Sequence, residues 1–190
     1  TDTPQIEIEG DSAEEQVVLP TETLEPTIEE PQISLGEQYR SEEGGYLFLT
    51  IPDAMIEAND GYVFMLSPEA DEQYGPGIVM VGNPLSEEQS LDEVFKEQME
   101  NMASSDTIVS EPKEVTVGGA PGLQVDMSSI ENNQTLTGKI IVVLVSPNQM
   151  FMLGGMAPLD EWDDFSATFE AVIESVAFFD LAAAESPPSG

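Results

Sequence analysis

The chain has 190 residues, of which 38 are acidic and four are basic, so its formal net charge at neutral pH is −34. It contains neither Cys nor His, which excludes disulfides, thiolate nucleophiles, zinc–thiolate sites and imidazole-based catalytic triads. Four basic residues cannot neutralise a row of phosphates, so nucleic acids and anionic lipid surfaces are not expected as partners.

Residues 1–37 differ in composition from the rest of the chain. They hold 11 acidic residues, four prolines and no basic residue, and the first aromatic residue of the chain is Tyr39. Such a segment repels itself and has too few large apolar side chains to build a core. We therefore expect a disordered acidic linker over 1–37, a folded domain over 38–180 and a short tail over 181–190. The folded domain still holds 26 of the acidic residues, so the acidity is not confined to the linker.

The sequence contains no apolar run of 18 residues, which predicts that nothing spans a membrane. The chain opens on Thr1 and a polar segment, without an initiator Met or a visible signal peptide. We expect that a signal was removed before residue 1. The protein is then extracytoplasmic, either secreted or lipid-anchored, and any membrane association comes from the removed anchor.

Short apolar runs bounded by turn residues predict the strands. Three turn signals separate neighbouring runs: Asn59-Asp60-Gly61, the Gly-rich segment 118–122, and Ser146-Pro147-Asn148. Links this short join antiparallel strands as hairpins. The predicted strands are 46–51, 62–66, 78–81, 114–117, 123–127, 136–145 and 149–156.

Two segments have the apolar periodicity of amphipathic helices. The first is 86–103, where either Ser90 and Glu93 or Ser86 and Gln89 have the spacing of a capping box. The second is 160–176, with Asp160 as the expected N-cap. The sole Trp, Trp162, opens this second helix and is expected to pack on the sheet. The order of three strands, a helix, four strands and a helix predicts an α+β fold with a mainly antiparallel sheet.

Three segments resemble the PsbP-like family, which includes extrinsic photosystem II proteins and bacterial lipoproteins of unknown role. They are GGYLFLTIPDAM (44–55), VTVGGAPGLQVDM (115–127) and MFMLGGMAPLDEWDDFSATFEAVIESVAFF (150–179), and the resemblance covers residues 39–180. It implies an α/β/α sandwich, in which helices flank the sheet on both sides, and an extracytoplasmic accessory role without catalysis. The metal-binding His residues of plant members have no counterpart here, so a photosynthetic role is not implied.

The densest acidic cluster in the expected domain is Asp160, Glu161, Asp163 and Asp164. Carboxylates in a first helical turn normally interact with free N–H groups and the helix dipole, which is how we interpret them. The alternative is a weak Ca²⁺ site built from the same four residues, because calcium prefers several oxygen ligands. The sequence contains no D-x-D-x-D-G calcium loop, and we expect no other cofactor.

Most of the nine methionines lie in apolar stripes, and we expect them to fill the core. The alternative is that some of them line an exposed Met-rich groove. The methionines concerned are Met80, Met99, Met102, Met127, Met150 and Met152.

The functional hypothesis is a non-catalytic extracytoplasmic binding or accessory domain, tethered by its linker and facing an unknown protein or cell-envelope partner. An anionic surface favours basic partners or cations. A calcium-responsive module is the first alternative. A hydrolase is the second, and it would need two carboxyl groups that face each other across a cleft.

Overall fold

The structure is a computed structural model that describes residues 33–68, 70, 75–102, 107–131 and 133–179. The chain divides into two units at residue 32, and all described residues belong to the second. Most of the expected linker and the expected tail lie outside the described residues, whereas Gly36 and Glu37 form backbone hydrogen bonds with Thr50. The elements are β1 (Gln38–Ser41), β2 (Tyr46–Leu49), β3 (Met55–Asn59), β4 (Tyr62–Leu66), β5 (Gly77–Pro84), α1 (Leu91–Met102), β6 (Thr107–Val109), β7 (Lys113–Val117), β8 (Ala120–Glu131), β9 (Gln134–Ser146), β10 (Gln149–Pro158), α2 (Trp162–Ser175) and β11 (Ala177–Phe178).

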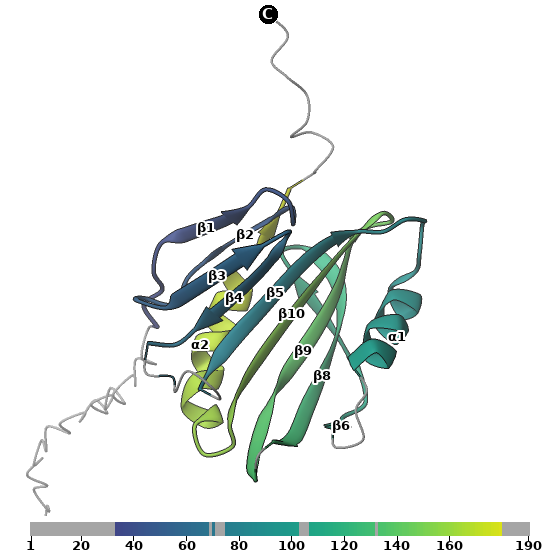
Figure 1. The fold of residues 1–190 in the computed structure, drawn as a ribbon. Helices are drawn as coiled ribbons and strands as arrows, with labels where there is room; N and C mark the ends of the chain where they lie inside the picture. Colours follow the sequence, from purple (N-terminus) through teal and green to yellow (C-terminus); the bar gives the residue numbers. More distant parts are fainter. Residues whose placement is uncertain (1–32, 69, 71–74, 103–106, 132, 180–190) are drawn as a thin grey trace, which may run out of the picture. The chain divides into compact units, whose positions relative to one another are not determined.

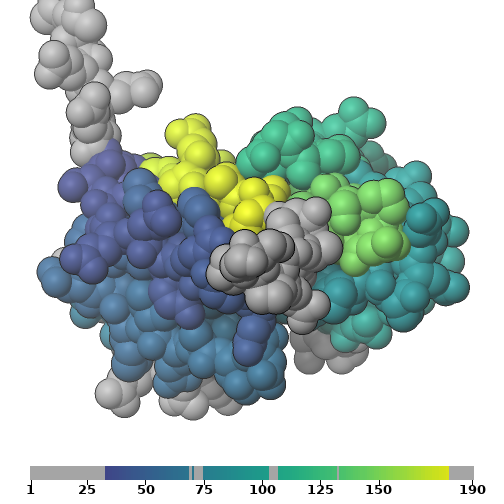
Figure 2. Space-filling model, turned by 90° about the horizontal axis from the view of Figure 1, so that it is seen from above, coloured from purple at the N-terminus to yellow at the C-terminus, as the bar shows by residue number. Residues whose placement is uncertain are grey.

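The strands form two antiparallel sheets (Figure 1). The larger sheet has eight strands in the order β3-β4-β5-β10-β9-β8-β6, and β7 also pairs with β8. The smaller sheet has the order β1-β2-β11, so the first and last described strands both pair with β2. Figure 2 shows the N-terminal strands of this sheet beside the C-terminal segment. The expected α+β fold with a mainly antiparallel sheet is confirmed.

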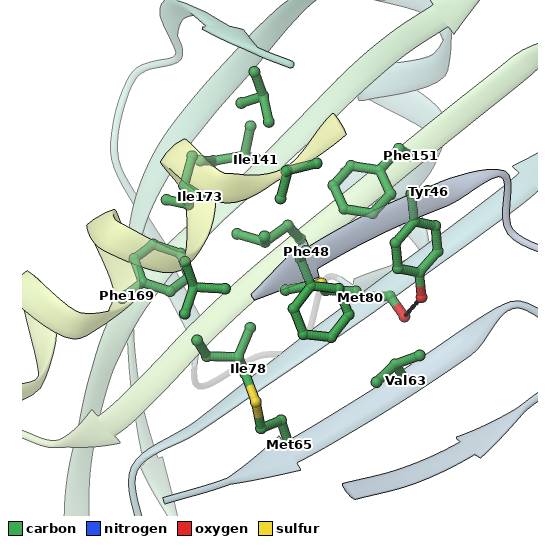
Figure 3. Packing of buried hydrophobic residues seen from close by; sticks show 14 of the residues in the cluster. Tyr46, Phe48, Val63, Met65, Ile78, Met80, Ile141, Phe151, Phe169 and Ile173 are labelled. Carbon is green, nitrogen blue, oxygen red and sulfur yellow. Dashed lines mark hydrogen bonds between the residues drawn. The ribbon is translucent and has the colours of Figure 1, made fainter. Parts of the chain in front are cut away.

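One face of the large sheet is covered by α2 and by the small sheet. The core between them includes Phe48 of β2, Phe151 of β10 and Phe169 of α2, all fully buried (Figure 3). Trp162 packs against the same core, as expected, with its ring 5.9 Å from that of Phe169. Tyr46 is also buried, and its hydroxyl lies 3.1 Å from the Gly61 carbonyl oxygen. Burial raises the pKa of this tyrosine.

The other face of the large sheet carries a smaller core beneath α1. Its buried members come from the helix and three strands, namely Val94, Val125, Ile140, Val142 and Met150. Strand β9 has packed side chains on both faces. Its residues Ile140 and Val142 belong to the core beneath α1, and the alternating residues Ile141 and Val143 belong to the core beneath α2. The part of a strand that is buried on both faces is apolar, which accounts for the longest apolar run of the sequence, residues 140–145. The two helices flank the sheet on opposite faces, as a sandwich requires.

The predicted strands all lie within or overlap observed ones, but β1, β3, β6 and β11 were not predicted. Strand β3 has no buried residue, so it lacks the alternation that marks a strand. Both helices begin later than expected. For α2, the N–H of Glu161 donates to the carbonyl of Pro158 at 2.9 Å, and this turn holds residues 158–161 outside the helix. The prediction that Asp160 is the N-cap is therefore wrong, because Glu161 holds that position, without a side-chain cap.

Candidate functional site

The candidate site is a cavity of about 510 Å³ on the α1 face of the large sheet. Its walls come from α1 and from strands β4, β5, β6, β8, β9 and β10. Most of the side chains that line it are apolar, and several of them are half-buried. The apolar lining residues are Phe64, Leu66, Val79, Met99, Met102, Val109, Met127, Leu136, Ile140, Met152 and Met156.

The cavity exists because α1 is too narrow to cover the sheet. A helix with its side chains is about 10 Å wide, whereas the spacing of strands places β4 about 19 Å from β8. Helix α1 packs on β8 and β9 and shares its core with Met150 of β10, which leaves β5, β4 and β3 without a helix on this face (Figure 1). On this face, no helix covers the side chains of these strands.

Glycines deepen the cavity. Residues directly opposite each other in an antiparallel sheet project to the same face, so the register defines rows across it. In one row Gly154 lies between Val79 and Ile140. In the next row Gly77 and Gly138 stand on either side of Met156. Gly77 and Gly154 line the cavity, and the missing side chains at these two positions leave a floor of backbone.

The start of α1 is fixed by a capping box. The Ser90 N–H donates to the Glu93 carboxylate at 2.9 Å, and the Ser90 hydroxyl donates to the same carboxylate at 2.7 Å. These hydrogen bonds hold the pKa of Glu93 below its usual value. Of the two capping boxes that the sequence allowed, Ser90 with Glu93 is the one that forms, so the helix begins at Leu91 and its stripe places Met99 and Met102 on the cavity wall.

The methionines divide between the two alternatives that the sequence left open. Met80 and Met150 are buried, which confirms core filling for these two. Met99, Met102, Met127 and Met152 line the cavity, and Met156 joins them. Met99, Met102, Met127 and Met152 are half-buried and also pack against the core beneath α1, so each of the two alternatives is correct for them in part. The strand glycines Gly77 and Gly154 were a signal for this site, because a Gly inside a strand often marks a place where another group approaches closely.

Only two of the described residues that line the cavity are charged. Glu131 is the one carboxylate among the described residues that line it, and Lys139 is the one cation. The ammonium of Lys139 contacts Glu170 of α2, on the opposite face of the sheet. The other three basic residues of the chain each contact a carboxylate too: Arg40 with Glu42, Lys96 with Glu100, and Lys113 with Asp126.

The acidic cluster of Asp160, Glu161, Asp163 and Asp164 lies where α2 begins, away from the cavity. Within the described part of the chain, no three acidic side chains are gathered closely enough to hold a metal ion. The four carboxylates therefore remain sequence-based calcium candidates, and the structure adds no ligand geometry for them. Asp163 and Asp164 stand in the first turn of the helix, where they interact favourably with its dipole.

Neither helix of the described residues is long and apolar enough to cross a membrane. Among the described residues that line the cavity, Glu131 is the one carboxylate, so they do not supply the facing pair of carboxyl groups that a hydrolase would need.

Comparison with known proteins gives matches in structure only. No family sequence model matches the chain, and no curated protein sequence is significantly similar to it. LpqN of Mycobacterium tuberculosis, described as involved in cell envelope biogenesis, has 14% identity and a TM-score of 0.55, over 76% of this chain and 91% of that one. PA94 of Pseudomonas aeruginosa, a protein of unknown function described as a putative regulator, has 12% identity and a TM-score of 0.51, over 75% and 96%. A cyanobacterial PsbP from Synechocystis has 12% identity and a TM-score of 0.48, over 75% and 92%.

The chain shares its fold with LpqN and PA94, and identities this low concern the fold alone. The observed architecture, an antiparallel sheet with a helix on each face, is the one that the sequence resemblance to the PsbP-like family implied.

Proposed function

We propose that this domain is a non-catalytic binding module that takes an apolar ligand group into the cavity beside α1. The observation that carries the proposal is the lining itself, which is apolar and half-exposed at the centre of a sheet face. A volume of about 510 Å³ lies within the usual range for ligand sites. The sequence has no His and no Cys, and Lys139 is engaged by Glu170, so the cavity offers little for acid–base or nucleophilic chemistry.

The proposed place of action is outside the cytoplasm, at the cell envelope or on the cell surface. Two observations support it. LpqN, which shares the fold, is described as involved in cell envelope biogenesis. The acidic, Pro-containing residues 1–37 have the composition of an extended tether. In this proposal the tether holds the domain near a membrane while the cavity meets its partner.

The experiment is a titration of the full chain with N-phenyl-1-naphthylamine, a neutral dye that fluoresces when it enters an apolar site. We expect saturable binding to the wild type. Gly154→Leu should weaken binding at least about tenfold, because its side chain would extend from the floor into the cavity between Val79 and Ile140. Met127→Gln and Met152→Gln together should weaken it through added polarity.

The matched control is Met55→Gln. Met55 is half-exposed on edge strand β3 and does not line the cavity, so this variant should bind as the wild type does. Circular dichroism establishes that each variant is folded. Equal binding by wild type, Gly154→Leu and the double methionine variant would refute the proposed function.

A further inference from the structure

We propose that the cavity receives the apolar side of a basic amphipathic helix presented by a partner protein. This inference rests on the proposed function and specifies the chemistry of the ligand. It draws on three features of the described residues: the flexibility of the cavity wall, the sign of the charge around it, and its position on the sheet face.

The wall suits side chains of varied shape. Met99 and Met102 on α1 face Met127, Met152 and Met156 on the sheet, so five of the chain's nine methionines line one cavity. Methionine is unbranched and polarizable, and surfaces rich in it repack around different apolar groups. Grooves that accept the apolar face of a helix use this property.

The rim favours positive charge. Glu131 stands on the wall itself. Glu57 lies opposite Phe64 across the β3–β4 pair, and therefore on the cavity face. Lysines on the polar side of a bound helix would meet these carboxylates.

An anionic ligand finds no counterion here. Lys139, the one basic residue among the described residues that line the cavity, already contacts Glu170, and Arg40, Lys96 and Lys113 are not among the lining residues. A fatty acid, an anionic phospholipid or an acidic peptide would bring negative charge into a field of the same sign, which costs free energy. The same field attracts a basic ligand and speeds its association.

The position of the cavity favours a helix over an added strand. Strand addition needs a free sheet edge with unpaired backbone groups. The cavity floor is formed by β5, β10 and β9, each paired on both sides. Its contacts must therefore come from side chains, and an amphipathic helix supplies these at intervals of three and four residues.

The test uses the full chain and three fluorescein-labelled peptides of about 18 residues, a length at which helices form readily. The first is an amphipathic Leu/Lys helix. The second has Glu in place of every Lys. The third has the composition of the first in a scrambled order without an apolar face. Anisotropy titrations give the affinities, and displacement of N-phenyl-1-naphthylamine reports on the cavity.

We expect the Leu/Lys helix to bind and to displace the dye, and the other two peptides to bind at least about tenfold more weakly. Gly154→Leu should weaken the helix by a similar factor. Glu57→Gln with Glu131→Gln should weaken it about three- to tenfold. The control pair Glu111→Gln with Glu174→Gln changes the net charge equally but away from the cavity lining, so it should cost less than about twofold.

Several results would overturn the inference. Equal binding of the scrambled peptide would mean that only bulk charge is sensed. Equal binding of the Glu peptide would remove the charge argument. Preferential binding to phosphatidylglycerol vesicles would point to a lipid. If the dye binds and the Leu/Lys helix does not displace it, the inference fails and the proposed function stands. If the dye does not bind either, both fail.

Discussion

Two adjacent glycines of β10 provide a direct test of the two unlike faces of the large sheet. Neighbouring residues of a strand point to opposite faces. A Cβ on Gly155 would overlap the ring of Phe169, which is fully buried in the α2 core. A Cβ on Gly154 would lie 3.2 Å from a methyl of Val79 and 3.8 Å from Ile140, at the edge of the cavity.

The same substitution should therefore have opposite consequences at the two positions. Gly155→Ala forces the Phe169 ring to move in a packed core, which costs about 1–3 kcal/mol. Gly154→Ala requires only a small shift of the Val79 methyl, and it restricts the unfolded chain, which stabilises by up to about 1 kcal/mol. The predicted difference of about 1–4 kcal/mol corresponds to roughly 2–16 °C in Tm.

The measurement is urea unfolding of the two variants and the wild type, followed by far-UV circular dichroism and repeated as a thermal melt. An unchanged dependence on urea concentration would show that both variants change stability without changing the unfolded state. If Gly154→Ala loses as much stability as Gly155→Ala, the α1 face is packed at this position and the cavity does not exist as described.

Four further predictions concern charge and the capping of α1. Raising NaCl from about 0.01 to about 0.15 M should raise Tm, because salt screens the repulsion among 38 acidic residues; a flat or falling Tm would contradict this. Ser90→Ala should cost about 1 kcal/mol by removing the cap of α1. The pKa of Glu93 is lowered in the folded state, so its contribution is present above its unfolded-state pKa and is lost as pH falls through the folded one. The stability gap between wild type and Glu93→Gln should close on acidification, and a constant gap would refute this. Calcium should raise Tm no more than an equal concentration of magnesium does, and a saturable calcium-specific rise would restore the acidic cluster of α2 as a metal site.

Much of the sheet could be predicted because turn residues in the sequence mark where its strands begin and end. The Gly118-Gly119 turn adopts positive φ angles at both glycines, and it joins β7 to β8 where the sequence places a bend. Strand β4 has the predicted bounds. Strand β3 was missed because all five of its residues are exposed, so its pairing with β4 leaves no apolar alternation in the sequence. The two residues of β11 carry no pattern of their own and pair with β2 only after α2 has returned the chain to it.

The cavity could be predicted only as one of two alternatives. It exists because the large sheet is wider than α1, and no local sequence pattern contains these two widths. The stripe on α1 predicts which methionines face the sheet, and the alternation in β10 predicts that Met152 and Met156 share a face. Neither predicts that the sheet extends three strands beyond the helix. The opposite face has the same width, but there α2 and the β1-β2-β11 sheet together cover it, so Phe151 and Leu153 are fully buried. Neighbouring residues of β10 therefore differ in exposure, because α2 and the small sheet cover one face of the large sheet whereas α1 alone covers the other. In our proposal, a partner's helix binds on the α1 face, beside α1.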